Sequence, residues 1–213
     1  MKKKLVLAVS LAVGLGSVPA MAADSGFYLG AGFGQATASG HDDNAVAVSE
    51  FFGSVVTSVS SDDTDTSISV FGGYDFNKHV GLEVNYADLG ARNVTVTDNI
   101  ATFTTDQYKF GMTGFGISLL GKLPITEKFS MFGKLGLFTW ESTVDTTIDF
   151  GGGSFVSTSV EETGSDLMLG IGATYRFTDH FGIRAEYEYY DIDSDEAGSG
   201  EFNVLSASAV LHF

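Results

Sequence analysis

Apolar and polar side chains alternate with a period of two through most of the chain that follows residue 24. Ile183, Ala185 and Tyr187, for example, are separated by Arg184 and Glu186. Because successive side chains of a β-strand point to opposite faces, this pattern predicts strands with one apolar and one polar face. We expect eight such strands, in the segments 27–34, 68–76, 82–86, 107–123, 129–144, 167–177, 181–189 and 205–213.

The connections between these segments alternate in length. Three are short, and four are longer and hold most of the acidic residues together with Ser, Thr and Gly. Long loops at one end and short turns at the other are typical of a bacterial outer-membrane barrel. The sequence therefore predicts an all-β, eight-stranded antiparallel up-and-down transmembrane β-barrel. The predicted short periplasmic turns are Asn77–His79, Pro124–Lys128 and Thr178–His180, and the predicted long extracellular loops lie near 37–66, 90–106, 142–164 and 191–201.

The polarity of the two faces separates this fold from a soluble antiparallel barrel, whose strands also alternate. A soluble barrel encloses its apolar side chains, whereas a membrane barrel turns them towards lipid. The second face here carries mainly Gly, Ser, Thr, Asn, Glu and Arg, a poor soluble core. We therefore expect apolar side chains to face lipid and hydrophilic ones to face the axis. The aromatic residues expected in two interfacial girdles are Phe27, Phe76, Tyr86, Phe129, Phe177, Phe181, Tyr187, Tyr189 and Phe213.

Two of the predicted strands are irregular. In 107–123 the apolar residues lie at even positions up to Met112 and at odd positions from Phe115. One extra residue, a β-bulge near Thr113-Gly114, would account for this change of face. In 129–144 both faces carry large apolar groups, so the register stays open apart from an inward Lys134.

The first 22 residues have the pattern of a secretory signal peptide. A lysine run at positions 2–4 precedes an apolar stretch, and Ala20-Met21-Ala22 supplies a small-residue cleavage site. A transmembrane anchor is the alternative, but the stretch is interrupted and shorter than the roughly 20 apolar residues that span a bilayer. We expect residues 1–22 to be cleaved and residues 23–213 to form a single barrel domain.

Composition excludes several classes of function. The chain has no cysteine, which excludes disulfide scaffolds, thiolate metal sites and thiol catalysis. Its formal net charge is −16 and its few basic residues are scattered, so no cationic stripe is available for phosphates. A nucleic-acid partner is therefore not expected.

Charged residues on the polar face form the candidate site. Eight strands enclose a lumen that side chains can fill. Charges of both signs should pair there, because an isolated buried charge is costly. We predict a salt-bridged plug that fixes the barrel, and the alternative is a narrow gated channel that uses the same groups. The predicted lumen charge network consists of Glu83, Lys122, Lys134, Arg176, Arg184, Glu186 and Glu188.

An enzymatic site is not expected. A hydrolase triad needs a Ser, a His and an acid within hydrogen-bond reach. None of the four histidines, at positions 41, 79, 180 and 212, is followed two residues later by a serine that would enter the same lumen.

A metal or cofactor site is not expected either. The segment Asp191–Asp195 imitates the start of an EF-hand loop, but Glu196 replaces the required glycine and Phe202 the bidentate glutamate. Loose screening of the acidic loops by Ca²⁺ or Mg²⁺ is the alternative to a defined site.

Two hairpins and the last strand resemble a known family. The segments 170–189 (GIGATYRFTDHFGIRAEYEY) and 73–90 (GYDFNKHVGLEVNYADLG) are similar to hairpins of the eight-stranded barrels typified by the membrane domain of outer-membrane protein A. The terminal alternation that ends in Phe213 is similar to the signal by which such barrels are recognised for assembly. The resemblance implies the same fold and contact of this strand with the barrel assembly machinery.

The resemblance also implies a place and a type of role. We expect a monomer in the bacterial cell outer membrane, surrounded by lipid and lipopolysaccharide. A structural or surface-interaction role is expected, in envelope integrity, adhesion or colonisation, with a host or surface ligand at the acidic loops. A narrow porin-like channel for small solutes or ions is the alternative. Because the chain stops at the barrel, no cell-wall tethering domain is expected.

Overall fold

The computed structural model describes residues 25–39, 56–62, 64–98, 105–149, 155–194 and 198–213. The predicted signal peptide lies outside these residues. Within the described ranges no helix is long and apolar enough to cross a bilayer. The strands are β1 (Gly26–Ser39), β2 (Val56–Asp62), β3 (Thr64–Asn77), β4 (Val80–Asp98), β5 (Thr105–Pro124), β6 (Phe129–Asp149), β7 (Phe155–Arg176), β8 (Phe181–Ser194) and β9 (Gly198–His212).

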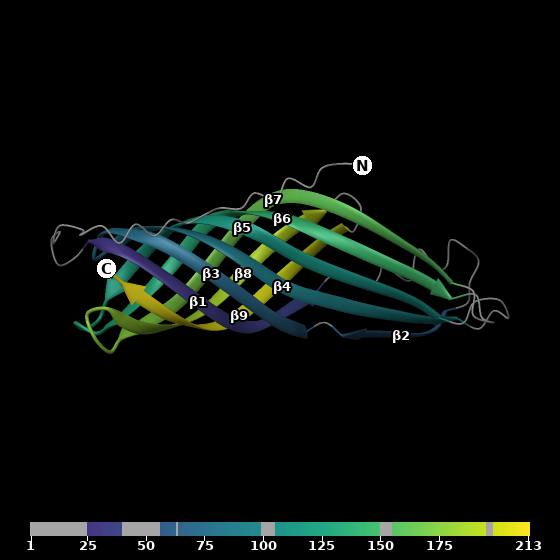
Figure 1. Ribbon diagram of the computed structural model, residues 1–213, viewed down its shortest axis with the longest axis horizontal. Coiled ribbons are helices and arrows are strands. Elements are labelled where there is room, and N and C mark those ends of the chain that lie inside the picture. The colour runs from purple at the N-terminus through teal and green to yellow at the C-terminus, as the bar shows by residue number, and fades with distance from the viewer. Residues whose placement is uncertain (1–24, 40–55, 63, 99–104, 150–154, 195–197) are drawn as a thin grey trace.

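The strands close into a barrel (Figure 1). β1 pairs with β3 on one side and with β9 on the other, and every neighbouring pair around the ring is antiparallel. β2 and β3 follow each other along the same partner, β4, so together they occupy one position in the ring. The nine segments therefore wrap as eight strands, which confirms the predicted fold. Closure leaves the membrane-embedded sheet without an unpaired edge.

The three predicted short turns are confirmed at one end of the barrel, and side-chain oxygens order each of them. Asn77 Oδ1 accepts a hydrogen bond from the backbone N–H of His79 at 2.8 Å. The Thr126 hydroxyl accepts one from the N–H of Phe129 at 2.9 Å, and Thr178 does the same in the third turn at 3.0 Å. Such local bonds favour tight turns over extended backbone.

The strands at the opposite end are longer than predicted. β6 and β7 stay paired as far as Asp149 and Phe155, and β4 and β5 as far as Val96 and Asp106. These segments are rich in Ser, Thr and Asp and carry few apolar residues, so the continued hairpin pairing is what extends them. The predicted loops near 90–106, 142–164 and 191–201 are therefore largely strand, and the one near 37–66 contains β2. Residues 40–55, 99–104, 150–154 and 195–197 lie outside the described chain.

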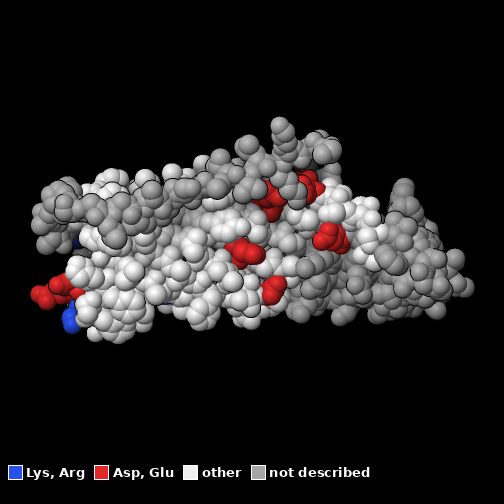
Figure 2. All heavy atoms as spheres, in the orientation of Figure 1, with Lys and Arg blue, Asp and Glu red and all other residues white. Residues whose placement is uncertain are grey.

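An apolar band surrounds the outside of the barrel next to the short turns. Ile171, Ile183 and Leu211 point outward with 57%, 47% and 50% of their surface exposed, which confirms the predicted orientation. On β9 the outward apolar run from Leu205 to Phe213 extends about 26 Å at about 3.3 Å per residue. Figure 2 shows a white band between the charged turn end and the red acidic side chains further along the wall. This is the surface that a lipid-facing β-barrel presents.

Aromatic rings mark both edges of the apolar band. Near the turn end the rings of Phe27 and Tyr74 lie 4.7 Å apart between centroids. At the opposite edge Tyr86 and Phe115 lie 4.9 Å apart. Rings of this kind suit the two membrane–water interfaces.

The interior is not polar throughout, which corrects the expectation of a hydrophilic axis. Beyond the apolar band the strands reverse their polarity: Trp140 and Ile192 point inward, whereas the adjacent Glu141 and Asp191 point outward. The reversal follows from the medium, because the outer wall there faces water in place of lipid. The resulting buried apolar cluster consists of Ala36, Ala38, Ala87, Leu89, Met112, Phe138, Trp140, Met168, Tyr190, Ile192, Phe202 and Val204.

The reversal also explains the irregular segment 107–123. β5 pairs with β6 in one unbroken register, so the β-bulge predicted near Thr113-Gly114 is wrong. Met112 points into the apolar cluster and Phe115 points outward into the band. The apolar residues change face because the surroundings change, and the strand needs no extra residue.

A register shift occurs in the neighbouring strand. Along β4 the pairing with β5 shifts between Asp88 and Ala91. Gly90 has a φ of 78°, which glycine adopts without steric cost. The Asp65 carboxylate accepts a hydrogen bond from the Ala91 N–H at 2.7 Å and holds the shifted backbone against β3.

Candidate functional site in the barrel lumen

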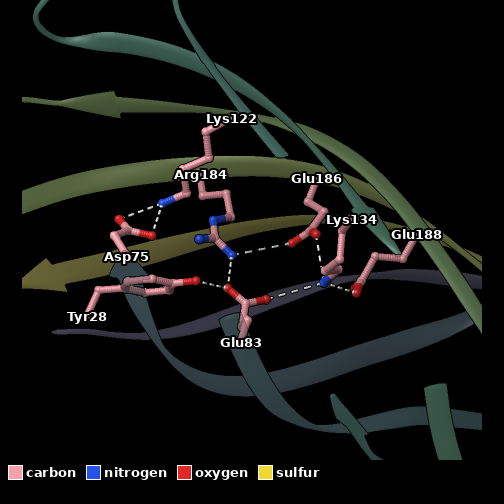
Figure 3. Close-up of polar contacts among 8 residues, drawn as sticks. All are labelled: Tyr28, Asp75, Glu83, Lys122, Lys134, Arg184, Glu186 and Glu188. Carbon is pink, nitrogen blue, oxygen red and sulfur yellow. Dashed lines mark hydrogen bonds and ion pairs between the residues drawn. The ribbon is translucent and has the colours of Figure 1, made fainter. Parts of the chain in front are cut away.

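Glu83 lies at the centre of the charged groups in the lumen (Figure 3). It points inward from β4 with 1% of its surface exposed. Its carboxylate accepts hydrogen bonds from Arg184 at 2.6 Å and from the Tyr28 hydroxyl at 2.9 Å. Lys134 approaches its other oxygen at 3.4 Å. Because three donors from three strands converge on it, this carboxylate joins opposite walls of the barrel.

Lys134 connects the remaining carboxylates. Its Nζ lies 2.8 Å from Glu186 and 2.5 Å from Glu188, besides its contact with Glu83. The side chain is 2% exposed, and its three partners are 1–6% exposed. The inward direction predicted for Lys134 is therefore observed. Ion pairs this deeply buried are costly to break, because removal of one partner leaves an uncompensated charge.

Arg184 packs against aromatic rings as well as against carboxylates. Its guanidinium carbon lies 4.4 Å from the Phe71 ring centroid, 4.8 Å from that of Phe132 and 5.4 Å from that of Tyr28. Such cation–π contacts add stabilisation where water is excluded. The rings and the ion-paired side chains are all buried in the lumen within the apolar band.

Lys122 forms a separate pair nearer the short turns. Its Nζ lies 2.5 Å from Asp75 Oδ1 and 4.9 Å from the Tyr28 ring centroid. Asp75 and Tyr28 are members of the site that were not among the predicted residues. The alternation of their strands placed Asp75 on the polar face, and this signal would have identified it. Tyr28 alternates with Phe27 and Leu29, so the same signal places it on the inner face as well.

Arg176 does not join the charge network. It is exposed at the end of β7, and its guanidinium donates to the backbone carbonyl of Glu127 at 3.0 Å. Its even position on β7 places it on the same face as the lumen residues, but it lies nearer the periplasm than the charge network. Phe213, the predicted assembly signal, has an exposed ring and donates its N–H to the Phe27 carbonyl at 2.9 Å.

The described histidines belong to the short-turn end. His79 Nδ1 lies 3.4 Å from the Lys122 carbonyl oxygen, and His180 Nδ1 lies 3.2 Å from that of His212. Both contacts order turns against strand ends. Within the part of the chain that the structure describes, no three His, Asp or Glu side chains are grouped to hold a metal ion. Asp191 belongs to β8 and pairs with Glu201 of β9.

The closed antiparallel ring, the apolar outer band and the charged side chains of the lumen define an integral membrane β-barrel. The family described as outer membrane protein beta-barrel domain matches residues 8–213. The chain belongs to this family and is a protein of the bacterial outer membrane. In such barrels the short turns face the periplasm, so the long strand ends of β4–β7 project from the cell.

The relatives that match in sequence are outer membrane protein A of several bacteria. Outer membrane protein A of Salmonella typhi is 34% identical over 121 residues, which cover 56% of this chain and 31% of that protein. The same protein of Shigella flexneri is 32% identical over equal shares. The matched region therefore spans about a third of the length of these relatives.

Solved structures share the fold at low identity. Neisserial surface protein A gives a TM-score of 0.53 at 18% identity and covers 89% of this chain and 99% of its own. Ail, the attachment invasion locus protein of Yersinia pestis, gives 0.52 at 14% identity with the same coverage. OprG from Pseudomonas aeruginosa gives 0.51 at 16% identity and covers 89% and 97%. These likenesses establish the fold alone.

Proposed function

We propose that this protein is a non-conducting barrel with a structural or surface-interaction role, which it performs through an acidic extracellular surface. The observation that carries the proposal is the double closure of the lumen. Within the apolar band the ion-pair layer around Glu83 and Lys134 fills the axis. Further out, Phe138 and Trp140 are 0% and 2% exposed in the apolar cluster. A solute would have to disrupt both layers to pass.

The extracellular wall defines the chemistry of a partner. Asp88, Glu141 and Asp191 are exposed and point outward beyond the apolar band. Arg92 and Lys109 are the only basic residues in the extracellular parts of the described strands. An excess of one charge steers and selects partners of the opposite charge. The fitting partner is a basic protein surface, or an anionic one bridged by divalent cations.

A sulfated polysaccharide does not fit this surface without bridging cations. Ail was solved in complex with the heparin analogue sucrose octasulfate, which is a polyanion. The shared fold does not transfer that ligand, because most charged residues of the described extracellular strands are acidic. Like charges in contact would repel unless cations intervened.

Adherence of bacteria that display the protein tests the surface role. The combined variant Asp88→Asn, Glu141→Gln, Asp191→Asn should bind less well than wild type to cultured cells and to a lysine-rich polypeptide coat. The matched control Glu127→Gln, Asp179→Asn removes exposed acids at the periplasmic end and should adhere like wild type. Equal adherence of all three strains, at equal surface amounts, would count against the acidic surface.

Planar-bilayer conductance tests the closed lumen against the alternative of a narrow channel. The refolded protein should leave the bilayer silent. Stable openings that disappear in Arg184→Gln or Glu186→Gln would establish the channel and reject the plug.

We also propose that β9 serves assembly through its exposed terminal ring. Phe213 follows an outward apolar run and lies at the periplasmic edge of the band. Phe213→Ala should reduce the fraction of protein that reaches the outer membrane as a heat-modifiable barrel. Unchanged assembly in cells would remove this role.

A further inference from the structure

A cavity of about 170 Å³ opens at the periplasmic end of the barrel. It lies between the short turns and the periplasmic ends of β1, β3, β5, β6, β7, β8 and β9. Asp75, Lys122 and Arg184 line it, and Figure 3 shows these side chains next to the lumen network. At about 30 Å³ for each liquid water, it holds a few waters or one small ion with its hydration.

Basic residues gather at this cavity although the chain as a whole is acidic. Five of the 11 Lys and Arg residues line it, three of them without a carboxylate partner in the described part of the chain. The other two are paired, Lys122 with Asp75 and Arg184 with Glu83. Besides Asp75, the acidic residues of the lining are Glu127 and Asp179. The five basic residues are Lys78, Lys122, Lys128, Arg176 and Arg184.

Two buried polar atoms of the lining have no hydrogen-bond partner. Arg184 is 3% exposed, and its Nη1 binds Glu83, but its Nε is buried without a partner among the described residues. The Nε2 atom of His212 is likewise buried and unpartnered. The Arg184 Nε–H is a fixed donor, and His212 Nε2 donates in the tautomer that carries its proton there. A buried donor that stays unsatisfied costs free energy, so a group that fills the cavity and accepts a hydrogen bond would recover it.

We propose that this cavity binds a small oxyanion of the phosphate class. Lysine ammonium groups and an arginine are the usual phosphate donors, and the hydroxyls of Thr126, Ser130 and Thr174 add further donors to the lining. The anion reaches the site from the periplasm, either as a free phosphate or as the phosphate of a lipid headgroup. The site is independent of the proposed surface role, which depends on the opposite end of the barrel.

Titration with inorganic phosphate tests the site. The full chain, refolded in phosphate-free maltoside micelles at low salt, is followed by NMR at the Arg184 Nε–H and the His212 ring. We expect saturable shifts at both groups. The double variant Lys78→Gln, Lys128→Gln should bind about tenfold more weakly, because two exposed cations of the lining are lost. The control Lys109→Gln removes a cation from the extracellular part of β5 and should titrate like wild type.

A second arm separates the two sources of phosphate. The same signals are recorded in phosphatidylglycerol nanodiscs without added phosphate. If they already lie at the bound position, a lipid headgroup occupies the site. If they move only when inorganic phosphate is added, the site takes the free anion.

Three results would overturn the proposal. The first is a shift that rises linearly without saturation. The second is an equal shift caused by chloride at the same ionic strength, which would indicate screening alone. The third is a double variant that titrates like wild type.

Discussion

Replacement of Lys134 by methionine isolates the energy of the lumen network. The change keeps the length and most of the volume of the side chain but removes the positive charge. Glu83, Glu186 and Glu188, which lie 2.5–3.4 Å from Nζ, then remain beside each other with Arg184 as their single cation. Because these side chains are at most 6% exposed, water cannot replace the lost partner. Loss of one partner of a buried pair costs about 3–5 kcal/mol, and we expect Lys134→Met to lower the unfolding free energy by that amount.

Denaturant unfolding in phospholipid vesicles measures this loss. The single tryptophan, Trp140, is buried in the apolar cluster and reports unfolding by its fluorescence. The control Lys128→Met removes an exposed cation from a periplasmic turn and should change stability by at most about 0.5 kcal/mol.

Removal of the excess carboxylates should restore stability. The triple variant Lys134→Met, Glu186→Gln, Glu188→Gln leaves the Glu83–Arg184 pair neutral and should recover at least half of the loss. A Lys134→Met protein within about 1 kcal/mol of wild type would refute the energetic role of the network. So would a triple variant no more stable than the single one.

Three further predictions follow from the placement of side chains. Ile171→Arg, in the middle of the apolar band on β7, should cost about 2–4 kcal/mol in vesicle unfolding, whereas Ser165→Arg beyond the band should cost about 0–1 kcal/mol. Equal costs would contradict the position of the band. Trp140 points inward, so brominated lipids should leave its emission unquenched; quenching would place it at the lipid surface. Glu83→Gln should lower the unfolding free energy by about 2–3 kcal/mol, because Glu83 accepts hydrogen bonds from three donors. Glu186→Gln should lower it by under about 1 kcal/mol, because three carboxylates share two cations. A larger loss for Glu186→Gln than for Glu83→Gln in the same unfolding assay would contradict this reasoning.

The fold and most of the lumen network were predictable because period-two alternation assigns each residue to one face. Glu83, Arg184, Glu186 and Glu188 lie on the polar face of regularly alternating strands. Lys134 is the one inward residue expected in the irregular segment 129–144, and closure of the barrel brings all five together. Alternation does not show how far along the barrel axis a residue lies. Arg176 has the same inward parity but lies past the last layer of side chains, where water solvates it.

The extracellular part was harder to predict for two physical reasons. Ser-, Thr- and Asp-rich segments pair in register with their neighbours although they carry few apolar residues, so the sequence predicts loops there. The alternation also keeps its period where the apolar face exchanges sides, as between Met112 and Phe115. This exchange imitates an inserted residue, and knowledge of where lipid gives way to water is needed to distinguish the two.

The reversal of polarity along the strands gives the two halves of the cylinder different sources of stability. The half next to the periplasmic turns is stabilised by lipid outside and ion pairs inside, so its stability should depend on bilayer thickness. The extracellular half encloses its own apolar side chains. It should keep its shape when lipids with shorter acyl chains, or detergent, replace the bilayer. The shape of the extracellular end should therefore depend little on the thickness of the membrane around the barrel.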